Sequence, residues 1–110
     1  MNYLLFILPC LFSGLSFSQK IFSTKEAYSA DVIVFVVKNE YQADLKVFKS
    51  KNQFQPNQNK GIWYFVDNQY TADKKVYFTE NQYQAALKLF FVEYEYQAGW
   101  KDKSKIHLLY

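Results

Sequence analysis

The chain has 110 residues, with 13 lysines and no arginine against 10 acidic side chains, and a formal net charge of +3. This length fits one domain, and the mild positive charge indicates a solvated surface and excludes a nucleic-acid site, because such sites favour the arginine fork. One cysteine, Cys10, cannot form a disulfide framework. The domain must therefore be held together by packing, for which 10 tyrosines, 11 phenylalanines and 2 tryptophans supply apolar area.

The N-terminal segment MNYLLFILPCLFSGLSFS contains no charged side chain. Small residues at Ser16 and Ser18 precede a polar stretch, which is typical of a signal-peptidase site. The apolar run falls short of the ~20 residues that a bilayer span needs, and Pro9 before Cys10 argues against a lipoprotein. We therefore expect a signal peptide over 1–18, export to the periplasm, cell surface or medium, and a single mature domain over 19–110 without an integral membrane span.

A tetrapeptide related to Tyr-Gln-Ala-Asp returns throughout the mature chain. Its last residue lies at Asp31, Asp44, Asn57, Asp73, Ala86 and Gly99. The interval is 13 residues except before Asp73, where an insertion over 58–60 precedes Gly61. The pattern predicts six units, ending at 31, 44, 57, 73, 86 and 99, followed by a C-terminal strand.

Aligned columns show how each unit is built. An apolar column contains Ile21, Val34, Val47, Trp63, Val76 and Leu89. The next column is aromatic and contains Phe22, Phe35, Phe48, Tyr64, Tyr77 and Phe90. The tyrosine of the tetrapeptide recurs as Tyr28, Tyr41, Phe54, Tyr70, Tyr83 and Tyr96. Because this last column varies only between Tyr and Phe beside small residues, we expect it to pack as a core ladder.

Each unit in turn begins with a run rich in β-branched and aromatic residues, such as DVIVFVV, LKVFKS, IWYFV or LKLFFV. These runs predict one strand of about six residues per unit, joined to the next by a turn or a single helical turn. Asparagines at the start of the connections are expected to cap them by accepting backbone N–H groups. They are Asn39, Asn52, Asn68 and Asn81.

The predicted fold class is mainly β, a curled antiparallel sheet or barrel-like meander. A small β-solenoid of parallel coils is the alternative. A strand of ~6 residues rises roughly 20 Å, so the rest of each unit would have to return fully extended, which leaves a flattened coil without an interior. Both strand faces carry apolar columns, so the connections are expected to fold over one rim of the sheet.

The two halves of the chain carry opposite charges just after their strands. Lysines follow the first three strands (Lys25, Lys38, Lys51), and acids follow the last three (Asp67, Glu80, Glu93). We expect these rows to lie close together and to set the register more than the stability, since exposed ion pairs contribute only about 0.2–1 kcal/mol each.

No catalytic or metal-binding constellation emerges. The acids Asp31, Asp44 and Asp73 offer one ligand per unit, too few for a calcium loop, and are interpreted as turn residues. His107 is the only histidine and lies in KIHLLY, interpreted as the terminal strand. We predict no catalytic residue, no metal and no cofactor.

Two tryptophans break the repeat pattern, Trp63 and Trp100. If the domain has a ligand surface, we expect it near these two residues and Lys101.

Units such as VFVVKNEYQADLKVF, closing with YQAGWKDKSKIHLLY, resemble a small family of exported bacterial proteins known as a domain of unknown function. The resemblance implies no activity. We predict a non-enzymatic structural or protein-interaction module, with a protein partner or a cell-envelope component. The alternative is a small-ligand or glycan-binding module that uses exposed aromatic residues.

Overall fold

The computed structural model describes residues 18–54 and 60–109. The predicted signal peptide, apart from Ser18, and most of the insertion before Gly61 lie outside the described residues. Within them, no helix is long and apolar enough to span a bilayer.

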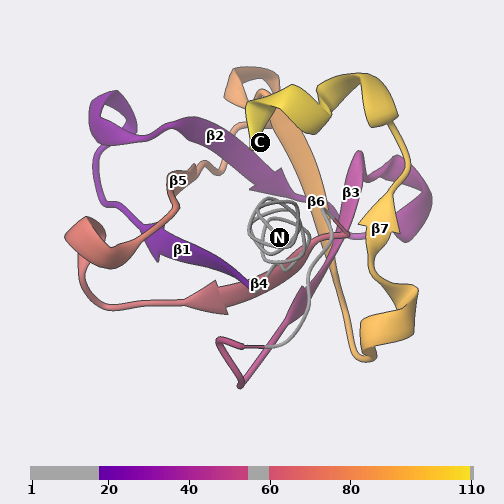
Figure 1. The fold of residues 1–110 in the computed structure, drawn as a ribbon. Helices are drawn as coiled ribbons and strands as arrows, with labels where there is room; N and C mark the ends of the chain where they lie inside the picture. The colour runs from indigo at the N-terminus through magenta and orange to yellow at the C-terminus, as the bar shows by residue number, and fades with distance from the viewer. Residues whose placement is uncertain (1–17, 55–59, 110) are drawn as a thin grey trace, which may run out of the picture.

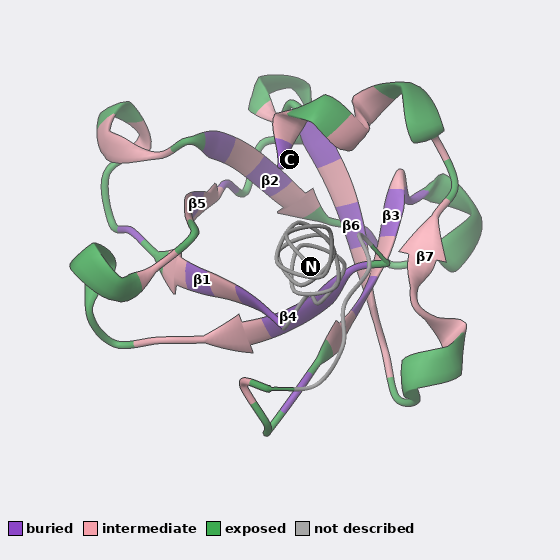
Figure 2. Ribbon diagram, viewed as in Figure 1, coloured by how far each residue is buried: buried purple, intermediate pink, exposed green. Residues whose placement is uncertain are grey.

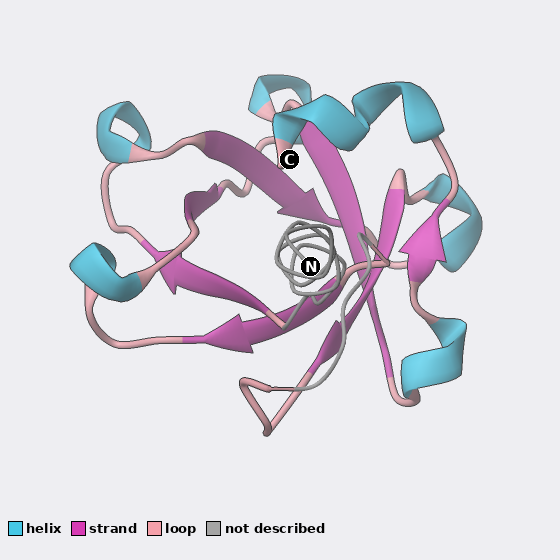
Figure 3. Ribbon diagram, viewed as in Figure 1, coloured by secondary structure: helices cyan, strands magenta, loops and turns pink. Residues whose placement is uncertain are grey.

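Short strands alternate with single turns of 3₁₀ helix (Figure 3). The strands are β1 (Gln19–Ser23), β2 (Val32–Val36), β3 (Leu45–Lys49), β4 (Ile62–Phe65), β5 (Lys74–Phe78), β6 (Leu87–Val92) and β7 (Gly99–Trp100). The turns are η1 (Ala27–Ser29), η2 (Glu40–Gln42), η3 (Gln69–Thr71), η4 (Gln82–Gln84), η5 (Glu95–Gln97) and η6 (Lys103–Leu108). The prediction of one strand and one short turn per unit is thus confirmed for the described units.

The strands form a closed barrel. Their order is β4-β1-β5-β2-β6-β3, and β3 pairs with β4 to close the ring. Every pair in the ring is parallel, and the antiparallel pair in the described structure joins β3 to the short β7. The mainly-β, barrel-like prediction is confirmed, but its antiparallel direction is wrong.

The stagger between strands explains how such short units can be parallel. Ser23 at the end of β1 pairs with Val76 of β5, and Val76 pairs with Val32 at the start of β2. Parallel strands ordinarily need a crossover of a dozen or more residues. Here the strands are so strongly offset that β2 begins at the level where β1 ends, and the connection only has to cross β5.

The two halves of the chain interleave. Each of β1, β2 and β3 lies between strands of the second half (Figure 1). The connection through η1 therefore passes outside β5, the one through η4 passes outside β2, and the one through η5 passes outside β3. Because each half crosses the strands of the other, the backbone forms a plait, an exception to the rule that connections do not thread.

The insertion before Gly61 has a topological role. Two steps of two places lead from β1 through β2 to β3 in the six-stranded ring, so a third identical step would return the chain to the place of β1. The longer connection instead places β4 directly beside β3 and β1. Gly61 has φ +85°, and a Cβ there would lie 2.7 Å from the Lys46 carbonyl oxygen, so this crowded corner requires glycine.

The first apolar column of the repeat forms the barrel core. Its six residues, which include Trp63, are all 0% exposed, and in Figure 2 buried bands alternate with half-buried ones along the strands. One layer further toward the ends of the strands lie Phe65, Phe78 and Phe91, which pack against this core. The aromatic column next to it alternates onto the outer face and is half-buried there.

The C-terminal segment lies at the barrel end where the strands begin. Leu109 is buried in the core, and its carbonyl accepts a 2.9 Å hydrogen bond from Gln19 Nε2 at the start of β1. The predicted terminal strand in KIHLLY is wrong, because residues 103–108 form the 3₁₀ helix η6. Apolar alternation there reflects Leu109 entering the core.

Candidate functional site

The acids of the repeat form a pair of reciprocal hydrogen bonds, here called a clasp, with the strand that their connection crosses. The N–H of Asp31 donates to the Lys75 carbonyl at 2.7 Å, and the N–H of Lys75 donates to Asp31 Oδ2 at 2.8 Å. Asp73 makes the same pair of bonds with Lys20. The interpretation of these acids as hydrogen-bonding turn residues holds, but their partners are distant in the sequence. One oxygen of each carboxylate is therefore engaged by the fold itself.

Each tetrapeptide tyrosine lies at the centre of a 3₁₀ turn. Asn68 and Asn81 cap η3 and η4 by accepting the N–H of the tyrosine two positions on, and Asn52 accepts the N–H of Phe54 in the same way outside a 3₁₀ turn. Asn39 occupies the same cap position of η2 without a side-chain bond. The side-chain cap therefore fixes the start of the connections that begin at Asn52, Asn68 and Asn81, but not the start of η2.

The tyrosine column faces solvent, so the prediction that it packs as a core ladder is wrong. The exposed fractions are 88% for Tyr28, 71% for Tyr41, 87% for Tyr70, 89% for Tyr83 and 82% for Tyr96. The fold explains this exposure: the turns cross outside the barrel, so the middle residue of each turn points away from the strand beneath. These residues recur because the turn recurs, not because the core needs their rings.

The exposed tyrosines encircle the barrel as an aromatic belt. Around the ring the turns follow the order η3, η1, η4, η2 and η5, all at the periphery of the view down the barrel in Figure 1. In the same order the belt consists of Tyr70, Tyr28, Tyr83, Tyr41 and Tyr96. Tyr94 extends it, since its ring stacks on that of Tyr96 with centroids 5.8 Å apart. Phe54, 62% exposed, is the sixth member of the column.

The oppositely charged rows lie together, as expected, at the end of the barrel where the strands finish. Because first-half strands alternate with second-half strands, lysines alternate with acids around this rim. The order is Asp67, Lys25, Glu80, Lys38, Glu93 and Lys51. Among the described residues these six form no ion pair with one another, and the ion pair between Lys105 and Asp44, at 3.0 Å, lies at the opposite end of the barrel, where the strands begin. The rim is thus a charge-balanced, solvated ring.

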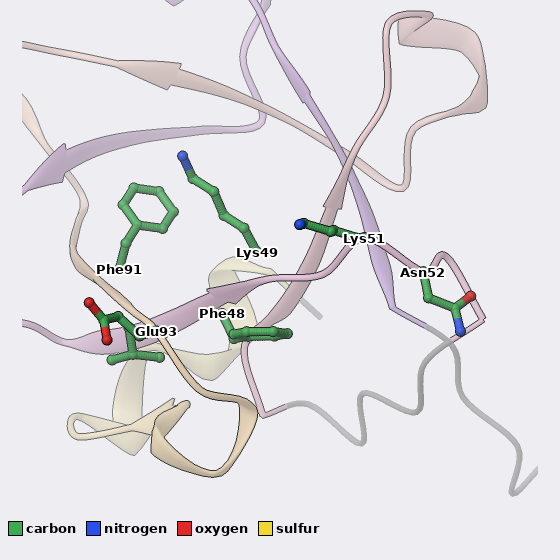
Figure 4. A pocket seen from close by; sticks show the side chains of 7 residues that line it. Phe48, Lys49, Lys51, Asn52, Phe91 and Glu93 are labelled. Carbon is green, nitrogen blue, oxygen red and sulfur yellow. The ribbon is translucent and has the colours of Figure 1, made fainter.

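Inside this rim the barrel has a hollow mouth of about 340 Å³, lined by Ser23, Val36, Lys49, Phe65, Phe78 and Phe91. The phenylalanine centroids are 6.4 Å apart from Phe65 to Phe78 and from Phe78 to Phe91. A second hollow of about 580 Å³ adjoins it along β3 and β6, and Lys49 and Phe91 line both. Figure 4 shows the Lys49 side chain alongside the Phe91 ring, with Glu93 on the far side of that ring.

Of the two tryptophans predicted to mark a ligand surface, Trp63 is fully buried and Trp100 is half-buried. Trp63 is 0% exposed and packs edge-on against Phe65 at 6.0 Å, so it has no face to offer a ligand. Trp100 packs against the core and is half-buried. Lys101 is exposed, and its Nζ donates to the Glu40 carbonyl at 3.3 Å. The break in the repeat at Trp63 comes from the size of the barrel interior that this residue fills.

No metal centre is present among residues 18–54 and 60–109, where no group of three His, Cys, Asp or Glu is placed to hold an ion. His107 Nδ1 lies 3.0 Å from the Ser104 carbonyl on the exposed side of η6. Nearby, two hydrogen bonds donated to the Asp102 carboxylate lower the pKa of this group below its usual 3.8. The larger effect comes from the Ser104 hydroxyl and the smaller from the Ser104 N–H. This group caps η6 and has a structural role.

Comparison with known proteins agrees with the plait. The model of a family described as the 7(1) septoil knot domain matches residues 18–101, which include all seven strands. No curated protein and no solved structure matches the chain. The description names a knot, and alternate crossing of two chain halves around one ring is an entanglement of that kind.

Proposed function

The chain belongs to the 7(1) septoil knot domain family, and we propose that it is a non-enzymatic, exported protein-interaction module whose binding surface is the aromatic belt. The observation that carries the proposal is the exposure of Tyr28, Tyr41, Tyr70, Tyr83 and Tyr96, between 71% and 89%. Large exposed aromatic residues indicate an interaction surface more strongly than buried ones, because the burial of an aromatic residue is explained by core packing alone.

Tyrosine suits such a surface. It combines a large apolar ring with a hydroxyl, loses little conformational entropy on binding, and is enriched in protein interfaces. Each belt tyrosine is followed within three residues by a chain position bonded to the crossed strand; Tyr28, for example, precedes the Asp31–Lys75 clasp. A turn held in this way is already ordered before binding, which reduces the entropic cost of association.

The belt runs around the barrel and is not gathered into one patch. A partner can therefore engage two or three adjacent turns, and identical turns elsewhere can engage further copies. Repeated contacts of this kind raise the overall avidity above that of a single contact. A protein partner in the cell envelope or medium fits this geometry, and export of the domain is part of the proposal.

The test compares two variants of the full chain in a photo-cross-linking capture from the envelope and secreted fractions of the source cells. The first changes four belt residues to serine: Tyr41, Tyr70, Tyr83 and Tyr96. The matched control changes the exposed residue before each of them to serine: Glu40, Gln69, Gln82 and Glu95. The proposal expects a protein captured by the native domain to be lost with the tyrosine variant and retained by the control. Equal capture by both variants, or no capture by the native domain, contradicts it.

Export is tested separately, by mass spectrometry of the protein recovered outside the cytoplasm. A mature N-terminus at Gln19 supports it. Recovery of the chain only in the cytoplasm, beginning at Met1, contradicts it without bearing on the belt.

A further inference from the structure

One lysine stands in a layer of the barrel that is otherwise suited to apolar contact. Lys49 is the β3 member of the mouth layer, level with Phe65, Phe78 and Phe91. Its Nζ lies 4.5 Å from the centroid of Phe91 and 5.6 Å from that of Phe65. In the part of the chain that the structure describes, no carboxylate lies within ion-pair distance of this ammonium.

The lining of the mouth combines an apolar wall with a single charge, that of Lys49. The three phenylalanines come from β4, β5 and β6, and Val36, 40% exposed, faces them from β2. The hollow of about 340 Å³ falls in the range of small-molecule sites. The charged residues of the rim beyond the mouth alternate in sign and balance one another. Lys49 is the charged residue of the mouth lining, and among the described residues no carboxylate forms an ion pair with it.

We propose that the barrel mouth binds a small carboxylate with an aromatic or branched aliphatic body. The apolar body packs on Phe65, Phe78 and Phe91, and the carboxylate accepts a charge-assisted hydrogen bond from Lys49 Nζ. Ser23 is the other polar side chain in the lining and can donate to the second carboxylate oxygen. A cationic ligand of the same shape meets the ammonium directly and is disfavoured.

This site is distinct from the aromatic belt. The belt lies on the connections outside the barrel, whereas the mouth opens inside the rim at the end of the strands. Either surface can be removed without the other, so failure of one proposal leaves the other standing.

The probes are 3-phenylpropionate, its primary amide and 3-phenylpropylamine, which share one body and differ in charge. Their affinities are measured by titration of the ¹⁵N-labelled domain, with residues of the mouth followed individually. The carboxylate is expected to bind about tenfold more tightly than the amide, as a charged hydrogen bond implies, and the amine is expected to bind most weakly. Equal affinities for carboxylate and amide, or shifts confined to residues outside the mouth, overturn the proposal.

Variants locate the site. Lys49→Met keeps the length of the stem and removes the charge, so the carboxylate is expected to lose its preference over the amide. Lys103→Met removes the same charge from η6 at the opposite end and is expected to change nothing. Val36→Phe fills the mouth and is expected to weaken both the carboxylate and the amide. Cooperative thermal unfolding verifies that each variant is folded, and unchanged carboxylate binding in Lys49→Met or Val36→Phe overturns the site.

Discussion

Asp44 and Lys88 hold each other through two reciprocal hydrogen bonds, one between backbone groups and one to the Asp44 carboxylate. The N–H of Asp44 donates to the Lys88 carbonyl at 2.8 Å, and the N–H of Lys88 donates to Asp44 Oδ2 at 2.9 Å. Asp44 belongs to the connection that follows η2, and Lys88 belongs to β6, the strand that this connection crosses. The bonds therefore fasten one half of the chain to the other at a crossing, and Lys105 adds an ion pair to the same carboxylate.

Substitution Asp44→Ala is expected to destabilise the domain by about 1–3 kcal/mol, because it removes the acceptor of the Lys88 N–H together with the ion pair to Lys105. Asp44→Asn, which keeps an acceptor oxygen, is expected to cost less. Chemical denaturation of the purified variants measures both. A loss below 0.5 kcal/mol for Asp44→Ala, the range of ordinary surface substitutions, contradicts the clasp.

The unit ending at Ala86 provides the converse experiment. The N–H of Ala86 donates to the Ile33 carbonyl at 2.9 Å, as in the clasped units, but alanine has no carboxylate to accept the Ile33 N–H. Substitution Ala86→Asp is expected to complete the clasp and to stabilise the domain by about 0.5–1.5 kcal/mol, the net value of one hydrogen bond. A melting temperature equal to or below that of the native chain is the opposing outcome.

At Gly61 the expectation is a severe loss. Gly61→Ala combines φ +85° with a Cβ 2.7 Å from the Lys46 carbonyl oxygen and 2.9 Å from Leu45 Cδ1. Strain and overpacking each cost about 1–3 kcal/mol. Gly99→Ala is the comparison, because Gly99 also has a positive φ (+156°) but a Cβ there meets no atom within 4 Å, so the crowding at Gly61 is what distinguishes the two. Denaturation curves that show Gly99→Ala to be the more damaging change would contradict the close approach at Gly61.

The Asp102 cap gives a pH dependence. Since its folded pKa lies below the ordinary 3.8, its contribution to stability is present above that value and is lost as the pH falls through the folded pKa. Ser104→Ala removes the first cause of the shift, so the pKa should rise toward 3.8. Titration of the carboxyl carbon by NMR in both proteins measures it. A midpoint that stays unchanged on substitution would show that Ser104 does not lower it.

The layers of the barrel were predictable from the sequence, because residues that pack in the same layer recur at the same position of each repeat unit. The column Ile21, Val34, Val47, Trp63, Val76 and Leu89 is the fully buried ring. The half-buried outer column, the asparagine caps and the position of the irregular connection before Gly61 could be recognised for the same reason: each depends on residues close together in the sequence.

Strand direction and the exposure of the tyrosines could not be predicted from local pattern. Both depend on which strand lies between β1 and β2, and that strand is β5, whose Val76 follows its partners Ser23 and Val32 by 53 and 44 residues. Once β5 occupies that place, the connection must cross outside it and turn Tyr28 toward solvent. A residue type that recurs at one position of an internal repeat can therefore reflect a repeated turn as readily as a repeated core contact.

Thermal unfolding of a variant with Tyr28, Tyr41, Tyr70, Tyr83 and Tyr96 all changed to serine tests the central claim most directly. If the barrel displays these rings and does not depend on them, each change costs no more than about 0.5 kcal/mol, and the variant unfolds cooperatively at a temperature only modestly below that of the native chain. Trp63→Ala, which empties the core, should cost about 3–5 kcal/mol by comparison. Loss of cooperative folding in the five-serine variant would show that the belt is part of the core and would contradict the account.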